Sequence, residues 1–182
     1  MKVSPTAIEG VLIVEPLVHR DERGFFVETW HAPRYAAAGI SLPFVQDNHS
    51  RSVRHTLRGL HYQIEQPQGK LVRVATGSVF DVAVDLRRSS RTFRRWVGVE
   101  LSEANQRQLW IPPGCAHGFY VLSELADLLY KCTAPYAREH DRALRWNDPD
   151  IGVAWPVGTN EPPRLSEKDA TAPFLHEAPT FP

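Results

Sequence analysis

The sequence contains few cysteines, and none are paired at a metal-binding spacing. Cys115 and Cys132 are the only two thiols among 182 residues, and no CxxC pair occurs. A framework of disulfides requires several cysteines, and a cysteine-based zinc site usually presents two at close spacing. We therefore expect neither feature in this protein.

The chain also lacks an excess of charge of either sign. It has 21 basic and 21 acidic residues, so its formal net charge is zero, which argues against a nucleic-acid partner. Only four of the basic residues are lysines, namely Lys2, Lys70, Lys131 and Lys168, so 17 are arginines. A forked guanidinium suits bidentate binding of phosphate or carboxylate, although a genome rich in arginine codons gives the same excess.

Long hydrophobic runs are absent. No stretch approaches the ~18 apolar residues of a membrane helix, so no membrane partner is expected. The first residues, MKVSPTAIEGVLIVEP, lack the apolar core and cleavage site of a signal peptide, and we expect a cytoplasmic protein. The length fits one domain over residues 1–182, with a proline-spotted C-terminal tail from about residue 170 packing on the surface.

Short β-rich runs separated by turn residues dominate the sequence, as is typical of a sandwich or barrel. Helix is scarce: APRYAAAG predicts a short helix ending at Gly39, and SEKDA predicts one turn with Ser166 as its N-cap. We therefore predict an all-β protein. The expected strands are Val11–Glu15, Phe25–Trp30, Phe44–Asn48, Leu57–Gln63, Leu71–Thr76, Val79–Leu86, Arg95–Leu101, Arg107–Ile111, Gly118–Val121 and Asp127–Thr133.

The run SVFDVAVDL shows the clearest alternation. Its large apolar residues, beginning with Phe80 and Val82, share one face, while Asp81, Ala83 and Asp85 share the other. The first face predicts a hydrophobic core, and the second could line a polar cavity.

The stretch TLRGLHYQIEQPQGKLVRV places several chemically useful side chains close together. Strict alternation puts His61 and Gln63 on one face of a strand and Arg58 on the other. His61 has three possible uses: a metal ligand, a general base, or an ordinary structural histidine. An imidazole titrates near neutral pH and can accept a proton at useful rates.

A metal at His61 is disfavoured by the neighbouring residues. Pro112, Gly114 and His117 resemble the second half of the metal-binding motif of the cupin fold, but Gln63 stands where the first half has its second histidine. Two histidines without further donors make a poor metal site. As a base, His61 needs a partner that fixes its orientation, and Asp169 is a candidate brought in by the fold.

Lysine and tyrosine side chains provide the other candidate catalytic groups. Lys70 begins a strand after QPQG, where it could stabilise an enolate oxygen or simply protect the edge of a sheet. Tyr130 could donate a proton, and Tyr136 could stack on a flat base, although either could instead be an interface aromatic.

Ten segments, in the family's order from Glu22 to Asp169, resemble the dTDP-4-dehydrorhamnose 3,5-epimerases. The span from the first segment to the last is about four fifths of the chain. The segment TAPYAREHD is shorter than the usual family loop. The matching segments are DERGFFVETW, FVQDNHSRS, LRGLHYQ, QGKLVRV, GSVFDVAVDLRRSS, TFRRWVGVELS, QLWIPPGCAHGFYVLSE, YKCTAPY, WNDPDIGVAWP and LSEKD.

The resemblance implies a metal-free cupin jelly roll that forms a homodimer and epimerises C3 and C5 of dTDP-4-dehydro-6-deoxy-D-glucose. It implies no cofactor, and the sequence contains no nucleotide-binding glycine motif. It assigns His61 as the base with Asp169 as its partner, Lys70 as the enolate stabiliser, and Tyr130 as the acid across the sugar.

The same resemblance assigns substrate contacts. Tyr136 is expected to stack on thymine, and Arg23 and Glu28 are expected to serve the neighbouring subunit through exchange of N-terminal strands. The expected contacts to nucleotide, diphosphate or sugar are Arg23, Glu28, Gln46, Asn48, Arg58, His117, Glu139 and Lys168. Relatives that act at one carbon only, ketoisomerases, a non-catalytic sugar-nucleotide binder and a metal-dependent oxygenase are the rival functions.

Overall fold

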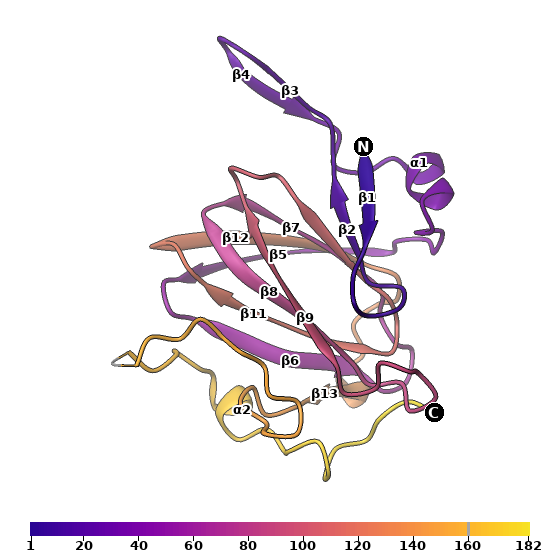
Figure 1. Cartoon of the computed structure of the whole chain (residues 1–182), viewed down its shortest axis with the longest axis vertical. Helices are drawn as coiled ribbons and strands as arrows, with labels where there is room; N and C mark the ends of the chain where they lie inside the picture. Colours follow the sequence, from indigo (N-terminus) through magenta and orange to yellow (C-terminus); the bar gives the residue numbers. More distant parts are fainter. Residues whose placement is uncertain (160) are drawn as a thin grey trace.

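Two antiparallel sheets that face each other make up most of the computed structural model, which describes residues 1–159 and 161–182 (Figure 1). The six-stranded sheet has the order β1 (Lys2–Pro5), β2 (Leu12–Glu15), β10 (Gln108–Ile111), β7 (Lys70–Thr76), β12 (Leu125–Cys132) and β5 (Gln46–Val53). The five-stranded sheet has the order β13 (Asp141–Ala143), β6 (Leu57–Gln63), β11 (Cys115–Val121), β8 (Ser78–Asp85) and β9 (Trp96–Ser102). This arrangement confirms the all-β, cupin-type jelly roll predicted from the sequence.

Each of the ten predicted strands overlaps an observed one, and Leu57–Gln63 is observed with the same bounds. No strand was predicted at β1, β3 (Val18–Asp21) or β13. The strand predicted at Phe44–Asn48 begins later and runs further, as β5. Its sequence, QDNHSRSV, has almost no apolar residue, so hydrophobic alternation could not reveal it.

Three groups of buried apolar side chains hold the layers together. The first fills the space between the sheets, with Val72 and Leu128 from the larger sheet meeting Val99 and Phe119 from the smaller. The second lies on the outer face of the smaller sheet, where segments after β13 cover the face of Val82. The third lies under helix α1 (Ala32–Ala37), on the outer face of the larger sheet. The space between the sheets is therefore a packed core, except where polar side chains point into it.

The alternation predicted for β8 is confirmed. Val82 and Val84 belong to the outer apolar group, while Ala83 faces the inter-sheet core. Asp81, on the same inward face as Ala83, accepts hydrogen bonds from His117. The strand thus separates an apolar outer face from an inward face that carries the buried Asp81 carboxylate beside core residues.

A β-bulge in β6 changes the direction of Arg58. His117 of β11 pairs with His61, but Phe119, two residues further along β11, pairs with Arg58, three residues back along β6. The extra residue lets Arg58 and His61 point to the same side, so the expectation that they lie on opposite faces was wrong. Gly59 permits the bulge, since its φ is 127° and an added Cβ would lie 2.5 Å from Cα of Gly118.

The hairpin of β3 and β4 (Gly24–Val27) and the C-terminal segment lie outside the two large sheets. This hairpin projects away from the two sheets (Figure 1). After the short helix η1 (Arg138–His140) and β13, the chain reaches α2 (Glu167–Ala170), which Ser166 caps as predicted. The tail then packs back on the barrel, with Leu175 and Ala178 buried. Within the described residues, no helix has both the length and the apolar character needed to cross a bilayer.

Candidate active site

A polar cavity of about 250 Å³ opens between the two sheets, at the end marked by β13 and α2. Its walls come from β5 and β12 of the larger sheet and from β6 and β13 of the smaller. The lining residues are Gln46, Asn48, His61, Tyr62, Gln63, Gln68, Lys70, Tyr130, Tyr136, Asp141 and Lys168. Seven of these eleven residues were predicted from the sequence as site residues, so the fold brings together positions that are up to 122 residues apart.

His61 and Asp169 form a hydrogen-bonded pair on one wall of this cavity. Nε2 of His61 lies 2.5 Å from Oδ1 of Asp169, and the Asp169 side chain is buried. The Ser166 hydroxyl donates to the other carboxylate oxygen at 2.8 Å. Burial alone would raise the pKa of Asp169, but the hydrogen bond and charge of His61, with hydrogen bonds from Ser166 and the Gly59 backbone, lower it below its ordinary value.

This pairing suits His61 to proton abstraction. Because an ionised Asp169 accepts the proton on Nε2, the neutral imidazole carries its lone pair on Nδ1. Within residues 1–159 and 161–182, Nδ1 has no hydrogen-bond partner. A substrate proton could therefore be taken at Nδ1 while Asp169 stabilises the resulting imidazolium.

Lys70 and Tyr130 approach the same cavity from the opposite sheet. Nζ of Lys70 lies 6.0 Å from the centre of the Tyr130 ring. Burial lowers the pKa of Lys70 and raises the pKa of Tyr130, with nearby Cys132 adding to the second effect. A Lys70 cation close to a protonated phenol can stabilise an oxyanion and donate a proton on the side opposite His61.

His117 lies deeper, directly across the strand pairing from His61. Its Nε2 lies 2.9 and 3.1 Å from the two carboxylate oxygens of Asp81, and both side chains are buried. The rings of His117 and Tyr130 are 6.4 Å apart. The predicted His117 thus faces the interior near both His61 and Tyr130, with its orientation fixed by Asp81.

Arg58 lines a second cavity, of about 300 Å³, that shares His61 with the first. Its Nε donates to the Ser52 hydroxyl at 3.0 Å. Asp169 also lines this second cavity. The two cavities therefore meet at His61, and Arg58 is available to a ligand that extends past the imidazole.

His117 pairs with His61 but lines neither of the two cavities, and three further predicted contacts lie away from His61 within one chain. Arg23 lies in the projecting hairpin, where it pairs with Asp21 at 2.6 Å, and Glu28 pairs with Arg34. The Glu139 side chain is 70% exposed and lines none of the cavities described here. The roles of Arg23, Glu28 and Glu139 in substrate binding therefore stay predictions.

Sequence reasoning assigned no site role to Asp81 or to four residues that line the cavity, namely Tyr62, Gln63, Gln68 and Asp141. Asp81 could have been found, because β8 alternation already placed it on the inward face. Gln63 was noticed only as a missing metal ligand, and Asp141 gave no signal because the three-residue strand that carries it has no hydrophobic pattern. Among the described residues, no group of three or more His, Cys, Asp or Glu side chains is arranged to hold a metal ion.

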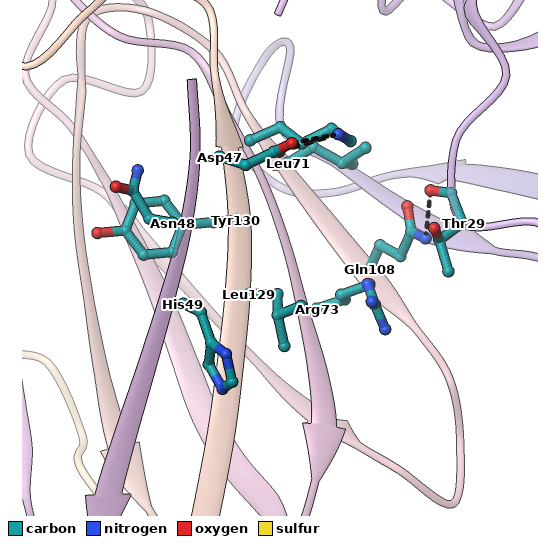
Figure 2. A pocket seen from close by; sticks show the side chains of 10 residues that line it. Thr29, Asp47, Asn48, His49, Leu71, Arg73, Gln108, Leu129 and Tyr130 are labelled. Carbon is teal, nitrogen blue, oxygen red and sulfur yellow. Dashed lines mark hydrogen bonds and ion pairs between the residues drawn. The ribbon is translucent and has the colours of Figure 1, made fainter. Parts of the chain in front are cut away.

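A further cavity, of about 300 Å³, lies on the outer face of the larger sheet (Figure 2). Leu129 and Arg73 lie on one side of the strands in this view, and Asn48 and Tyr130 lie on the other. This outer cavity lacks His61, Lys70 and Asp169. We place the chemistry in the smaller cavity, because only there do a base, a cation and an acid converge.

Residues 5–177 match the family model described as dTDP-4-dehydrorhamnose 3,5-epimerase. The chain is 54% identical over 183 residues to the Pseudomonas aeruginosa dTDP-4-dehydrorhamnose 3,5-epimerase, covering 100% of both proteins. A Legionella pneumophila dTDP-6-deoxy-D-glucose-3,5-epimerase, solved in complex with dTDP-4-keto-L-rhamnose, is 53% identical with a TM-score of 0.93, covering 96% of this chain and 93% of that one.

A functionally different relative is also similar. A Streptomyces bikiniensis 3'-monoepimerase, solved in complex with dTDP-quinovose, is 35% identical with a TM-score of 0.88, covering 94% of this chain and 87% of that one. The family model spans almost the whole chain, and the identity to the Pseudomonas aeruginosa and Legionella pneumophila 3,5-epimerases exceeds one half. The chain therefore belongs to the dTDP-4-dehydrorhamnose 3,5-epimerase family.

Proposed function

We propose that this enzyme epimerises C3 and C5 of dTDP-4-dehydro-6-deoxy-D-glucose to give dTDP-4-dehydro-L-rhamnose. The observation that carries the proposal is the placement of a base and an acid on opposite walls of one cavity: His61, paired with Asp169, on one wall, and Tyr130 with Lys70 on the other. An epimerisation needs this arrangement, because the proton must leave one face of the sugar and return on the other.

The chemical steps follow from the side chains. C3 and C5 both flank the C4 ketone, so a hydrogen on either carbon is acidic. Nδ1 of His61 takes that proton, and the electron pair moves onto the C4 oxygen as an enolate. The Lys70 ammonium stabilises the enolate oxygen. Tyr130 then donates its phenolic proton to the carbon from the opposite face, and the ketone re-forms.

Each step leaves the oxidation state of the sugar unchanged, so the mechanism uses no redox cofactor. After one inversion His61 carries the extra proton and Tyr130 has lost one. Burial raises the pKa of Tyr130, which favours recovery of its proton from water. His61 releases its extra proton to water, and both groups are then ready for inversion at the second carbon.

Substrate binding uses the remaining polar groups of the cavity. Lys168 and Gln46 at the mouth suit the diphosphate and nucleotide, and the Tyr136 ring is exposed for stacking on thymine. Arg58 and His117 suit the sugar or the adjoining phosphate. Asn48, which pairs with Tyr130 between β5 and β12, is a proposed substrate contact. Glu139 is a further proposed contact.

The active unit in this proposal is a homodimer in which each hairpin serves the neighbouring site. The projecting β3–β4 hairpin exposes Phe25 and Phe26 to 53% and 68%, and a second chain would bury these rings and receive Arg23 and Glu28. Mixing an Arg23→Ala chain with an His61→Ala chain tests this. Hybrid dimers regain activity if Arg23 acts across subunits, whereas no recovery indicates that it acts within its own chain or not at all.

Incubation with the 4-keto sugar nucleotide in D₂O, followed by NMR, tests the reaction. Deuterium at both C3 and C5 with inversion at both supports the proposal. The similarity to the 3'-monoepimerase makes a single-carbon reaction the alternative, and label at one carbon alone would establish it. Absence of exchange at either carbon, in protein that binds dTDP, would support a non-catalytic binder.

A further inference from the structure

One carboxylate joins two residues at the mouth of the cavity. Oδ2 of Asp141 accepts a hydrogen bond from the Tyr136 hydroxyl at 3.2 Å and a second from Nζ of Lys168. These residues come from three separate places: β13, the segment after β12, and α2. The Asp141 side chain is 19% exposed, and it lines the cavity itself.

The backbone around Tyr136 is fixed as well. The Tyr136 N–H donates to Oε1 of Gln46 at 2.8 Å, and the Ala137 N–H donates to Oε1 of Gln63 at 2.8 Å. Nε2 of Gln63 donates to the carbonyl oxygens of Gln66 and Pro135, at 3.0 and 3.2 Å. The exposed Tyr136 side chain is thus held by a hydrogen bond at its hydroxyl, and its backbone is held by hydrogen bonds from Pro135 to Ala137.

Gln63 suits this task because a primary amide both accepts and donates hydrogen bonds. The side chain is 3% exposed, so each of its amide atoms needs a partner within the protein. Residue Gln63 also pairs with Asp141 between β6 and β13. One short strand pairing therefore sets both the carboxylate and the amide beneath Tyr136.

We propose that Asp141 and Gln63 are positioning residues that hold the Tyr136 ring and the Lys168 ammonium ready for the nucleotide end of the substrate. This inference rests on the proposed function, in which that end is a dTDP group. A ring fixed before binding loses less conformational freedom when thymine stacks on it. The Asp141 carboxylate similarly keeps the flexible Lys168 side chain at the mouth.

The test measures dTDP binding by calorimetry, separately from turnover. Asp141→Asn keeps the shape but weakens both bonds at Oδ2, so the Kd for dTDP should rise about tenfold, while kcat at saturating substrate changes less than about twofold. Gln63→Met should act in the same direction by releasing the Tyr136 segment. Asp150→Asn, the same change at an exposed residue of the segment after β13, should leave both quantities unchanged.

A double-mutant cycle tests whether Asp141 acts through Tyr136. Tyr136→Phe keeps the ring but removes its hydroxyl, so Asp141→Asn/Tyr136→Phe should weaken dTDP binding by less than the product of the single effects. Strict multiplicativity would show that Asp141 does not act through Tyr136. Glu139→Gln provides the competing arm: weaker binding in that variant, with normal binding in Asp141→Asn, overturns the proposal.

The failures can be told apart. Wild-type protein that does not bind dTDP contradicts the proposed function itself. Wild-type protein that binds dTDP, together with an Asp141→Asn variant that binds equally well, contradicts only the positioning role. A Gln63→Met protein that does not fold leaves the decision with Asp141→Asn and Tyr136→Phe, which alter groups near the surface.

Discussion

Nε2 of His61 lies 2.5 Å from Oδ1 of Asp169, although 108 residues separate them in the sequence. The pair exists because α2 is capped by Ser166 and packs against β6, so that its one buried residue meets the edge of the cavity. An imidazole held in this way has Nε2 bonded to a carboxylate, while Nδ1 has no hydrogen-bond partner within the described residues.

Replacing His61 by alanine should abolish proton exchange at both C3 and C5. General-base catalysis typically contributes about 10²–10⁴-fold, and we expect a loss of turnover in this range or beyond. Deuterium incorporation measured by NMR checks the result, with His176→Ala as the control, since that side chain is 68% exposed near the C-terminus. Exchange at the wild-type rate in His61→Ala would assign the base to another group.

Replacing Asp169 by asparagine should reduce the dependence of stability on acidic pH. The pKa of Asp169 is lower in the folded protein than its ordinary value, so its contribution is complete above the unfolded pKa of about 3.9 and is lost as pH falls through the folded pKa. Urea unfolding between pH 7 and pH 3 should therefore show a steeper loss in the wild-type protein below about pH 4. Equal slopes in the two proteins would contradict a carboxylate stabilised by His61.

Much of the fold could be predicted from the sequence, because the central strands carry the apolar alternation that burial requires. Strands such as β6 and β8 were found closely for this reason. The polar strand β5 was only partly found, and β13 was missed, because polar or very short strands carry no such pattern. The positions of β5 and β13 depend on which strands they pair with, and this pairing cannot be read from the sequence.

The candidate catalytic residues were predicted through family resemblance, since His61, Lys70 and Tyr130 singly carry no sign that they lie together in the fold. The prediction of which way side chains point along β6 was wrong. The bulge at Gly59 turned Arg58 toward the site, and alternation cannot register an inserted residue. Asp141 escaped notice because its importance comes from two long-range contacts, with Tyr136 and Lys168.

Replacing Tyr130 by phenylalanine should separate exchange from inversion. His61 can still remove a proton, and deuterium from solvent can return by way of His61 on the same face. We expect deuterium uptake in recovered substrate to persist, while inverted product falls by at least about 10²-fold because the acid is missing. Simultaneous analysis of label and configuration by NMR measures both. Inversion at the wild-type rate would exclude Tyr130 as the donor.

Lys70 should give the pH profile a limb on its alkaline side. Burial lowers the pKa of Lys70 below its ordinary value of 10.5, so the ammonium form needed for enolate stabilisation is lost at a lower pH than for a free lysine. The value of kcat/KM should therefore fall as the pH rises through this lowered pKa. In Lys70→Met the rate should drop about 10²–10³-fold, as for loss of one oxyanion donor, and this limb should disappear, whereas Lys2→Met keeps it. A limb that persists in Lys70→Met belongs to another group.

The bulge itself can be tested through Gly59, because the backbone there tolerates no side chain. A Cβ would meet Cα of Gly118 at 2.5 Å, and φ is 127°. Gly59→Ala should therefore destabilise the protein by about 1–3 kcal/mol or more, measured by urea unfolding. Gly158→Ala is the matched control, since nothing lies within 4 Å of its added Cβ. If Gly59→Ala folds with wild-type stability, the bulge is not fixed by glycine. If it folds with reduced stability, kcat/KM should fall further than stability alone explains, because a straightened β6 would turn Arg58 away from the cavity that contains His61.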